Sequence, residues 1–267
     1  MDRRDDRLRL TVVRAWFRFY AELNDFLSPE RRQAAFSHTF DQRASIKDVI
    51  ESLGVPHTEV DLILVNGQSV DFSCLVRDGD RVSVYPVFEA LDISPLALVR
   101  PAPLREVRFV LDAHLGRLAA YLRLAGFDTV CQPDPGDAEL ADTSLREQRI
   151  LLTRDHGLLK RKVVTHGYFV RATRPSDQLI EVLGRFDLAR SVTPFSRCLR
   201  CNGEIESVRP DLVWSRLPPR IRATHREFWR CRSCGRAYWK GSHYARLARL
   251  VDEAIASLGG RNGNRAP

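Results

Sequence analysis

Apolar and polar positions alternate in short runs over the first ninety residues, which is the period of β-strands with one buried face. The strand-like runs are 11–20, 37–40, 60–65 and 81–87. Between the second and third runs the spacing becomes helical, with Ser45 as a suitable N-cap and Gly54 as a C-terminal stop. Asn66-Gly67 gives a strong signal for a tight turn. The order β-β-α-β-β predicts a small α+β domain over residues 8–90.

Between residues 105 and 190, short apolar runs alternate with longer stretches of helical spacing. The predicted strands are 107–111, 128–130, 149–153 and 167–171, and the predicted helices are 114–125, 137–148 and 176–186. This alternation favours a parallel sheet with helices on both faces. The first helix has its predicted buried stripe at Leu115, Leu118, Ala119 and Leu122. Arg117 and Arg123 are expected to lie off this stripe.

The remaining segments differ in composition. Pro95, Pro101 and Pro103 predict an irregular linker over 91–104. A cysteine-containing module is expected over 191–250, followed over 251–267 by a helix end and, from Gly259, a disordered tail. No apolar stretch approaches the roughly 20 residues of a membrane helix, and the N-terminus lacks the layout of a secretory signal. We therefore expect a soluble, cytoplasmic protein with no membrane partner.

Positive charge is concentrated in the cysteine module. The chain has a net charge of +8, but residues 1–100 carry 13 basic and 16 acidic side chains. Residues 101–190 carry 14 and 12, whereas residues 191–250 carry 13 and 4. A basic excess on one module favours a polyanionic partner, most simply nucleic acid. An Arg-rich proteome is the alternative explanation.

Two Cys-x-x-Cys pairs lie in this module, at Cys198 and Cys201 and at Cys231 and Cys234. A two-residue gap lets both thiolates of a pair face one ion, and four thiolates complete a closed tetrahedral Zn²⁺ site. We therefore predict a zinc ribbon with a structural metal and an insertion around Pro218-Pro219. Two disulfides or a redox pair are the alternatives. Cys74 and Cys131 fit no such pattern and are expected to be buried apolar residues.

Arginines and aromatic residues are interleaved around the cysteines, a combination typical of single-stranded or looped RNA recognition. The basic candidates for RNA contact in this module are Arg200, Arg232, Arg236, Lys240 and His243. The aromatic residues are Trp214, Phe228, Trp229, Tyr238, Trp239 and Tyr244. The alternatives are that many of these rings form the small core of the ribbon and that His243 caps the following helix.

Acidic side chains follow two of the predicted central strands. Asp112 comes directly after 107–111, and Asp155 comes just after 149–153. Ligands of open parallel sheets bind at the carboxyl ends of strands, where these carboxylates can hold a divalent cation. Asp137 and Asp177, at the starts of helices, are further candidates. A bound Mg²⁺ or Mn²⁺ would relieve their repulsion and activate water for attack on a phosphodiester. Each aspartate is alternatively only a helix N-cap.

Several long motifs resemble the Mut-seven C-terminal RNase family, and they occur in the expected order. They are 112–119, 122–129, 149–155, 197–203 and 228–243. The resemblance implies a PIN-like nuclease domain over 105–190 fused to a zinc ribbon, with Asp112, Asp137 and Asp155 as metal ligands. In this chain Gly136 stands before Asp137, where an acidic pair is common.

Residues 64–67 and 77–86 resemble the ubiquitin-like β-grasp family of small sulfur carriers. This implies a ubiquitin-like fold for residues 8–90. Sulfur carriers end in Gly-Gly, whereas this domain ends in Val87-Phe88-Glu89-Ala90 and the chain continues. The carrier chemistry therefore does not transfer, and we expect the domain to dock on a protein partner.

Together these observations predict a multidomain α/β protein with metal-dependent endoribonuclease activity. The further basic residues expected to hold the RNA backbone are Arg117, Arg154, Lys160, Arg161 and Lys162. The RNA is a tRNA, an mRNA or ribosomal RNA. The rival hypotheses are a non-catalytic RNA- or ribosome-binding factor with an idle site and a toxin-like nuclease silenced by a partner.

Overall fold

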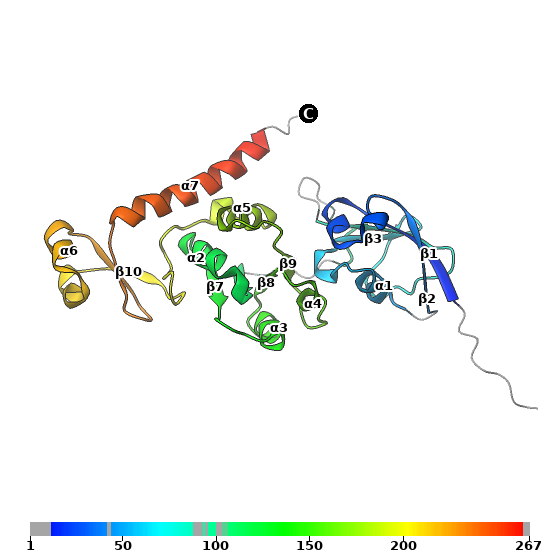
Figure 1. Ribbon diagram of the computed structural model, residues 1–267, viewed down its shortest axis with the longest axis horizontal. Coiled ribbons are helices and arrows are strands. Elements are labelled where there is room, and N and C mark those ends of the chain that lie inside the picture. Colours follow the sequence, from blue (N-terminus) through cyan, green and yellow to red (C-terminus); the bar gives the residue numbers. More distant parts are fainter. Residues whose placement is uncertain are drawn as a thin grey trace, which may run out of the picture. The chain divides into compact units, whose positions relative to one another are not determined.

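The chain folds into two compact units (Figure 1). The first comprises residues 1–103 and 155–168, and the second comprises residues 104–154 and 169–267. The computed structural model describes residues 12–41, 44–87, 93, 96–99, 104 and 106–263. The predicted linker over 91–104 therefore lies mostly outside the described residues. Within the described part of the chain, no helix is both long enough and apolar enough to cross a membrane.

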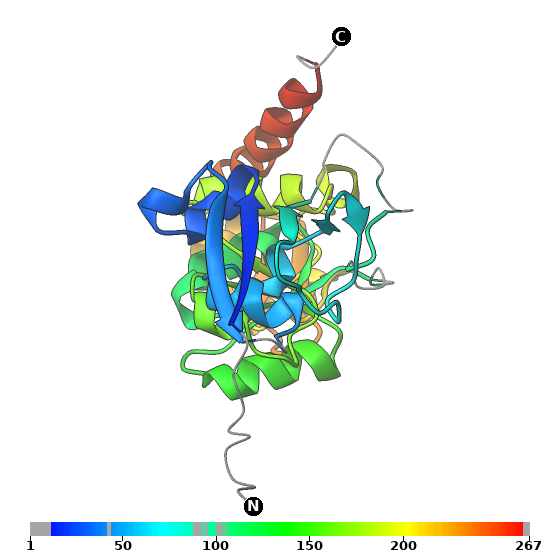
Figure 2. The same ribbon diagram turned by 90° about the vertical axis from the view of Figure 1, so that its right-hand side faces the viewer.

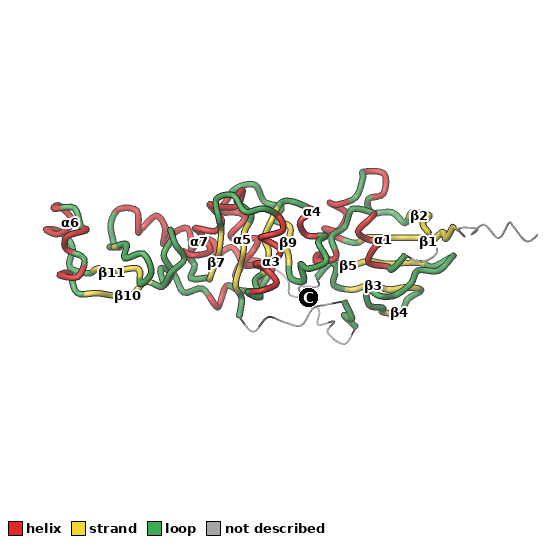
Figure 3. The backbone as a smooth tube through the Cα atoms, turned by 90° about the horizontal axis from the view of Figure 1, so that it is seen from below, coloured by secondary structure: helices red, strands yellow, loops and turns green. Residues whose placement is uncertain are grey.

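The first unit contains a five-stranded mixed sheet in the order β2-β1-β5-β3-β4 (Figures 2 and 3). Its strands are β1 (Val12–Phe19), β2 (Phe36–Asp41), β3 (Leu62–Val65), β4 (Gln68–Ser69) and β5 (Arg81–Tyr85). β1 and β5 are parallel, and the other neighbours are antiparallel. Successive side chains of β1 alternate between exposed and buried. This sheet and α1 (Ile46–Ser52) confirm the predicted β-grasp fold; the predicted order lacked the two-residue strand β4 and the short 3-10 helices.

Local chemistry explains where these elements begin and turn. The Ser45 side chain accepts a hydrogen bond from the Asp48 amide at 3.2 Å, as an N-cap residue should. Asn66 and Gly67 both have positive φ, +51° and +86°, which matches the twist of the β3–β4 hairpin. Short 3-10 helices complete the connections: η1 (Ala21–Phe26), η2 (Pro29–Arg31) and η3 (His57–Glu59).

A segment distant in sequence also belongs to the first unit. Residues 155–168 include α4 (His156–Leu159) and pack beside the β-grasp elements. His57 makes hydrogen bonds through both ring nitrogens, to the Glu51 carboxylate at 2.6 Å and to the Val164 carbonyl at 2.9 Å. Lys160 donates its ammonium to the Glu51 carbonyl at 2.9 Å. These contacts join the segment to α1 and η3.

A four-stranded sheet has the order β7-β6-β8-β9, and its strands β6, β7 and β8 lie in the second unit. The strands are β6 (Arg108–Leu111), β7 (Asp128–Cys131), β8 (Ile150–Thr153) and β9 (Gly167–Phe169). β6 pairs in parallel with β7 and β8. The helices are η4 (Ala113–Leu115), α2 (Gly116–Leu124), α3 (Asp137–Arg146) and α5 (Pro175–Arg185), followed by η5 (Ala189–Ser191). Figure 1 shows α2 and α5 on one side of the sheet and α3 on the other, which confirms the predicted layers.

The C-terminal part of this unit is a three-stranded antiparallel sheet followed by a long helix. The strands are β10 (Ile205–Val208), β11 (Phe228–Cys231) and β12 (Ala237–Tyr238). The predicted insertion forms η6 (Pro210–Leu212), η7 (Trp214–Arg216) and α6 (Pro219–Thr224). Val213, Leu217 and Phe228 form its small core. The final helix α7 (Ser242–Gly263) contacts α5 and extends past Gly259, where the sequence predicted a tail.

Arg123 joins the two parts of the second unit, and our expectation that it points away from the buried stripe was wrong. Its side chain is only 8% exposed. The guanidinium donates to the Thr129 carbonyl at 2.8 Å and to the Leu199 and Arg200 carbonyls at 3.1 and 3.2 Å. Arg123 thus ties α2 and β7 to the turn between the first two metal-site cysteines. Burial lowers the pKa of the guanidinium, although neighbouring acidic groups oppose this.

A second group of polar contacts reinforces this junction. The Asn202 side chain accepts from the Thr129 amide at 2.9 Å and donates to the Asp128 carboxylate at 2.7 Å. Asp128 also pairs with buried Arg149 at 2.7 Å. Burial disfavours the charged form of Asp128, but the hydrogen bonds from Arg149 and Asn202 outweigh it and lower the pKa of the carboxyl group. The ribbon is therefore fixed to the start of β7 by partly buried hydrogen bonds.

We predict that Arg123→Met will lower the free energy of unfolding of the second unit by about 3 kcal/mol, since one buried and two partly buried carbonyls lose their guanidinium donor. Urea denaturation followed by circular dichroism measures this change. Arg117→Met, an exposed position on the same helix, is the matched control and should have little effect. Equal stabilities of the two variants would contradict the role assigned to Arg123.

Asp128 should also make stability depend on pH. The folded-state pKa of the Asp128 carboxyl group is lowered. The stabilisation that its carboxylate provides is therefore fully present above the unfolded-state pKa of about 3.9, and it is lost as the pH falls through the folded-state pKa. Asp128→Asn should be less stable than the wild type at neutral pH, and this difference should shrink below about pH 4. Thermal unfolding across this pH range tests the prediction; a constant difference would contradict it.

Candidate functional site

The two cysteine pairs have nearly the same local geometry. The amide of the residue after each pair donates to the carbonyl of the first cysteine at 2.9 Å, Asn202 to Cys198 and Gly235 to Cys231. These two residues have positive φ of +69° and +68°. The conformation favours Gly or Asn, which explains why these residues follow the second cysteine of each pair. The sequence thus folds locally into two knuckles whose thiols face one another.

The four sulfur atoms lie within 4.8 Å of one another. Cys198 and Cys234 are 3.8 Å apart, and Cys201 and Cys231 are 3.4 Å apart. A tetrahedral ion with metal–sulfur bonds of about 2.3 Å places its ligands at roughly 3.8 Å spacing. The cluster therefore has the size and donor set of a four-thiolate metal site.

Electrostatics also favour a cation here. Burial opposes ionisation of Cys198, but hydrogen bonds from the Tyr238 hydroxyl, 3.0 Å away, and from backbone amides lower the pKa of its thiol to about 6. Burial and hydrogen bonds with the neighbouring thiols raise the pKa of Cys201 to about 12. Four thiolates this close repel one another, so all four thiols can be ionised at the same time only when a positive ion is bound between them.

The other two cysteines lie apart from this cluster. Cys74 and Cys131 are half-buried rather than buried as the sequence suggested. Burial raises the pKa of both thiols, which keeps them protonated at neutral pH.

Asp112 lies where the sequence placed it, directly after β6. One carboxylate oxygen caps η4 by accepting from the His114 amide at 3.5 Å, and the other accepts from the Thr153 hydroxyl at 3.0 Å. Thr153 ends β8, so this hydrogen bond connects the carboxyl ends of two neighbouring parallel strands. Asp112 is half-buried and forms no ion pair with any residue that the structure describes. Its negative charge is therefore held in place but not neutralised by a protein cation.

The other predicted carboxylates stand at the starts of helices. Asp155 follows the last residue of β8 by two positions and caps α4, accepting from the Gly157 amide at 2.6 Å. Asp137 is the first residue of α3, after the N-cap Gly136. Asp177 lies in the first turn of α5, where the Ser176 hydroxyl donates to it at 3.3 Å. All three side chains are exposed.

Among the described residues, the four cysteines are the only group of three or more His, Cys, Asp or Glu side chains with ligand atoms within 4.8 Å of one another. The predicted carboxylates are not gathered at that spacing. Asp112, Asp137, Asp155 and Asp177 remain predictions as ligands of a second metal.

One family model covers most of the second unit. The Mut7-C RNase domain model matches residues 107–251, more than half of the chain, and the Mut7-C ubiquitin domain model matches residues 12–92. The chain belongs to the Mut7-C RNase family. No curated protein and no solved structure matches it. The Mut7-C RNase match includes both the parallel sheet and the cysteine site, the two parts that Arg123 and Asn202 join.

The basic residues predicted to bind RNA fall into three groups in this Mut7-C RNase chain. Some already contact protein groups: Arg154 donates to the Ala172 carbonyl at 2.7 Å, Lys160 donates to Glu51, and Arg232 pairs with Glu204 and Glu206 at 3.0 Å. Four more are exposed, as Arg154 and Arg232 also are; these four are Arg117, Arg161, Lys162 and Arg200. The third group, Arg236, Lys240 and His243, lines a single cavity.

Sequence reasoning missed the residues that hold the two parts together, Arg123, Asp128 and Asn202. One signal for Arg123 was present: it follows Ala119 by four residues and therefore lies on the buried face of α2. Asp128 and Asn202 are far apart in sequence, and no local pattern indicates that their side chains meet.

We expect the purified protein to contain about one tightly bound metal ion per chain, as a closed four-thiolate site requires. Cys231→Ser should abolish this binding, whereas Cys74→Ser, the same substitution in the first unit, should retain it. Elemental analysis of the purified variants measures the stoichiometry. Metal-free wild-type protein, or equal metal content in both variants, would contradict the assignment.

Proposed function

We propose that this protein is a metal-dependent endoribonuclease that hydrolyses phosphodiester bonds in RNA. The observation that carries the proposal is Asp112, a half-buried carboxylate without an ion pair among the described residues. It stands at the carboxyl end of a parallel strand, in the region that matches the RNase family model. Sites of open parallel sheets form at such strand ends.

In this proposal Asp112, Asp137 and Asp155, with Asp177 as a further candidate, hold Mg²⁺ or Mn²⁺. The hard carboxylate oxygens of Asp112 suit these ions, and its two hydrogen bonds come from neutral donors, which leave its charge available. Such a cation, when bound, neutralises phosphate charge and activates water. Thr153 would fix the orientation of the Asp112 carboxylate, and Arg117, Arg161 and Lys162 would hold the RNA backbone.

We further propose that the cysteine site holds Zn²⁺ with a structural role. Four thiolates leave no position for a substrate, so the ion would stabilise the fold and not take part in catalysis. The basic and aromatic surface around it would supply affinity for RNA. The support for this is the concentration of positive charge in residues 191–250.

The alternative is a non-catalytic RNA- or ribosome-binding factor. One observation favours it: Asp112 and Asp155 both cap helices, a structural role that needs no metal. The two functions make different predictions for RNA cleavage.

For the β-grasp unit we propose docking on a protein partner. Trp16 is 48% exposed on the outward face of β1. Arg14 and Arg18 flank it on the same face. An exposed Trp between arginines is a common composition of protein interfaces.

The test compares RNA cleavage by wild type, Asp112→Asn and Asp142→Asn with added Mn²⁺. Asn caps helices as well as Asp does, so Asp112→Asn should fold. The rate at which Asp112→Asn cleaves RNA should fall by more than the roughly 10–100-fold that is typical when a residue outside the ligand shell is changed. Asp142, an exposed residue paired with Arg146 on α3, is the matched control.

Undiminished cleavage by Asp112→Asn would dismiss the proposed site. If no form cleaves RNA but all bind it in a salt-sensitive manner, the binding factor is the correct function.

A further inference from the structure

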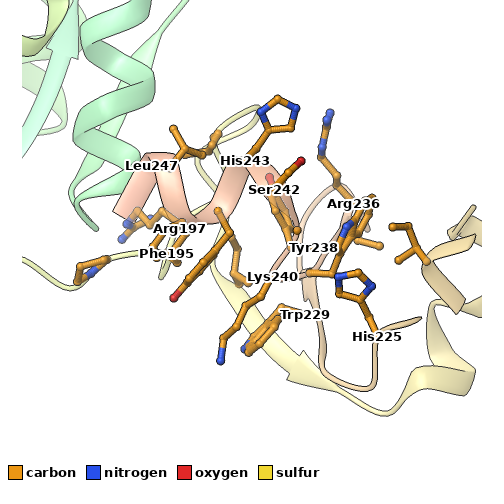
Figure 4. A pocket seen from close by; sticks show the side chains of 18 residues that line it. Phe195, Arg197, His225, Trp229, Arg236, Tyr238, Lys240, Ser242, His243 and Leu247 are labelled. Atoms are coloured by element: carbon orange, nitrogen blue, oxygen red, sulfur yellow. The ribbon is translucent and has the colours of Figure 1, made fainter. Parts of the chain in front are cut away.

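A cavity of about 780 Å³ lies in the C-terminal part of the second unit (Figure 4). The cavity is lined by residues of the segment 194–199, by the sheet β10–β12, by α6 and the residues after it, and by the beginning of α7. Its volume falls within the range of roughly 300–1,000 Å³ found for small-molecule sites. The lining residues of the cavity include no Asp or Glu, so none of the predicted carboxylate ligands contributes to it.

Aromatic rings form much of the cavity wall. Trp229 on β11 and Tyr238 on β12 line it, as do Phe195 and Tyr244, which stack on each other with centroids 4.4 Å apart. The hydroxyl of Tyr238 lies 3.0 Å from the sulfur of Cys198, so the metal site helps to fix this ring. Such rings offer flat faces on which an unstacked nucleobase can lie.

Cationic side chains surround these rings. Arg197 donates to the Asn202 carbonyl at 3.0 Å, and Lys240 pairs with Glu227 at 3.0 Å. Arg236 is exposed and, unlike Arg197 and Lys240, forms no ion pair within the described part of the chain. A guanidinium binds phosphate oxygens through two parallel hydrogen bonds, and Arg236 retains this capacity.

We infer that this cavity binds one unpaired nucleotide of a single-stranded RNA, with its base against Trp229 and a phosphate on Arg236. The inference rests on the proposed function only in taking RNA as the ligand. A base-paired nucleotide keeps both faces stacked within the helix and cannot enter a concave site. The cavity therefore selects single-stranded regions, and the metal at the cysteine site supports it through Tyr238.

The test measures binding of a fluorescein-labelled oligouridine of about 12 nucleotides to the full, metal-loaded chain without added Mg²⁺ or Mn²⁺. Arg236→Gln should weaken binding about tenfold and reduce the dependence of log K on log[salt] by about 0.7, the value for one phosphate contact on a single strand. Arg146→Gln on α3 removes the same charge outside the cavity and should bind like wild type. Trp229→Leu should weaken binding about tenfold, whereas Trp16→Leu, which changes an exposed Trp of the first unit, should not.

Two further ligands complete the test. The same oligouridine in a duplex with oligoadenosine should bind at least about tenfold more weakly, and uridine monophosphate should compete only at much higher concentration. Wild-type affinity and salt dependence in Arg236→Gln, or equal affinity for duplex, would overturn the inference. Equal affinity for the free mononucleotide would also overturn it.

Cleavage and binding separate the two proposals. If Asp112→Asn abolishes cleavage while Arg236→Gln binds RNA normally, the nuclease proposal stands and this inference fails. If no form cleaves RNA but Arg236→Gln selectively weakens single-strand binding, the inference stands and the nuclease proposal fails.

Discussion

The buried guanidinium of Arg123 is the interaction on which the second unit depends. A charged group that is 8% exposed is stable only when hydrogen bonds replace its lost hydration. Here the replacements come from both sides of a junction, the carbonyl of Thr129 in the parallel sheet and those of Leu199 and Arg200 in the first knuckle. The ribbon is consequently a fixed extension of the sheet and not a separately tethered module.

Because of this junction, the metal site can stabilise residues other than its own ligands. The backbone turn that positions Cys198 and Cys201 is the turn that Arg123 and Asn202 hold. Tyr238 connects the same cysteine to the aromatic cavity. An ion at the cysteines would therefore stabilise the knuckle, the contact with β7 and the wall of the cavity together.

The parts of this structure that the sequence predicted are those encoded by local chemistry. The Ser45 cap, the Asn66-Gly67 turn and the Cys-x-x-Cys knuckles each require particular residue types at fixed spacing, so a single stretch of chain is enough to recognise them. The apolar stripe of α2 was also predicted, because helical periodicity selects one face.

The features that escaped prediction depend on distant contacts. The burial of Arg123 depends on carbonyls more than seventy residues away. The packing of residues 155–168 depends on His57 and Glu51, which precede them by about a hundred positions. The aromatic composition of the ribbon was evident, but only the fold shows that Phe195, Trp229 and Tyr244 line one cavity.

Hydrogen exchange with and without the cysteine-bound metal tests the junction most directly. The Thr129 amide donates to Asn202, and the Thr193 and Phe195 amides donate to the carbonyls of Ala125 and Leu124 at the end of α2. Removal of the metal should accelerate exchange at all three amides, while amides of the first-unit strands β1 and β5 stay protected. Faster exchange confined to residues 198–240, with Thr129 unchanged, would show that the ribbon is not coupled to the sheet and would contradict this account.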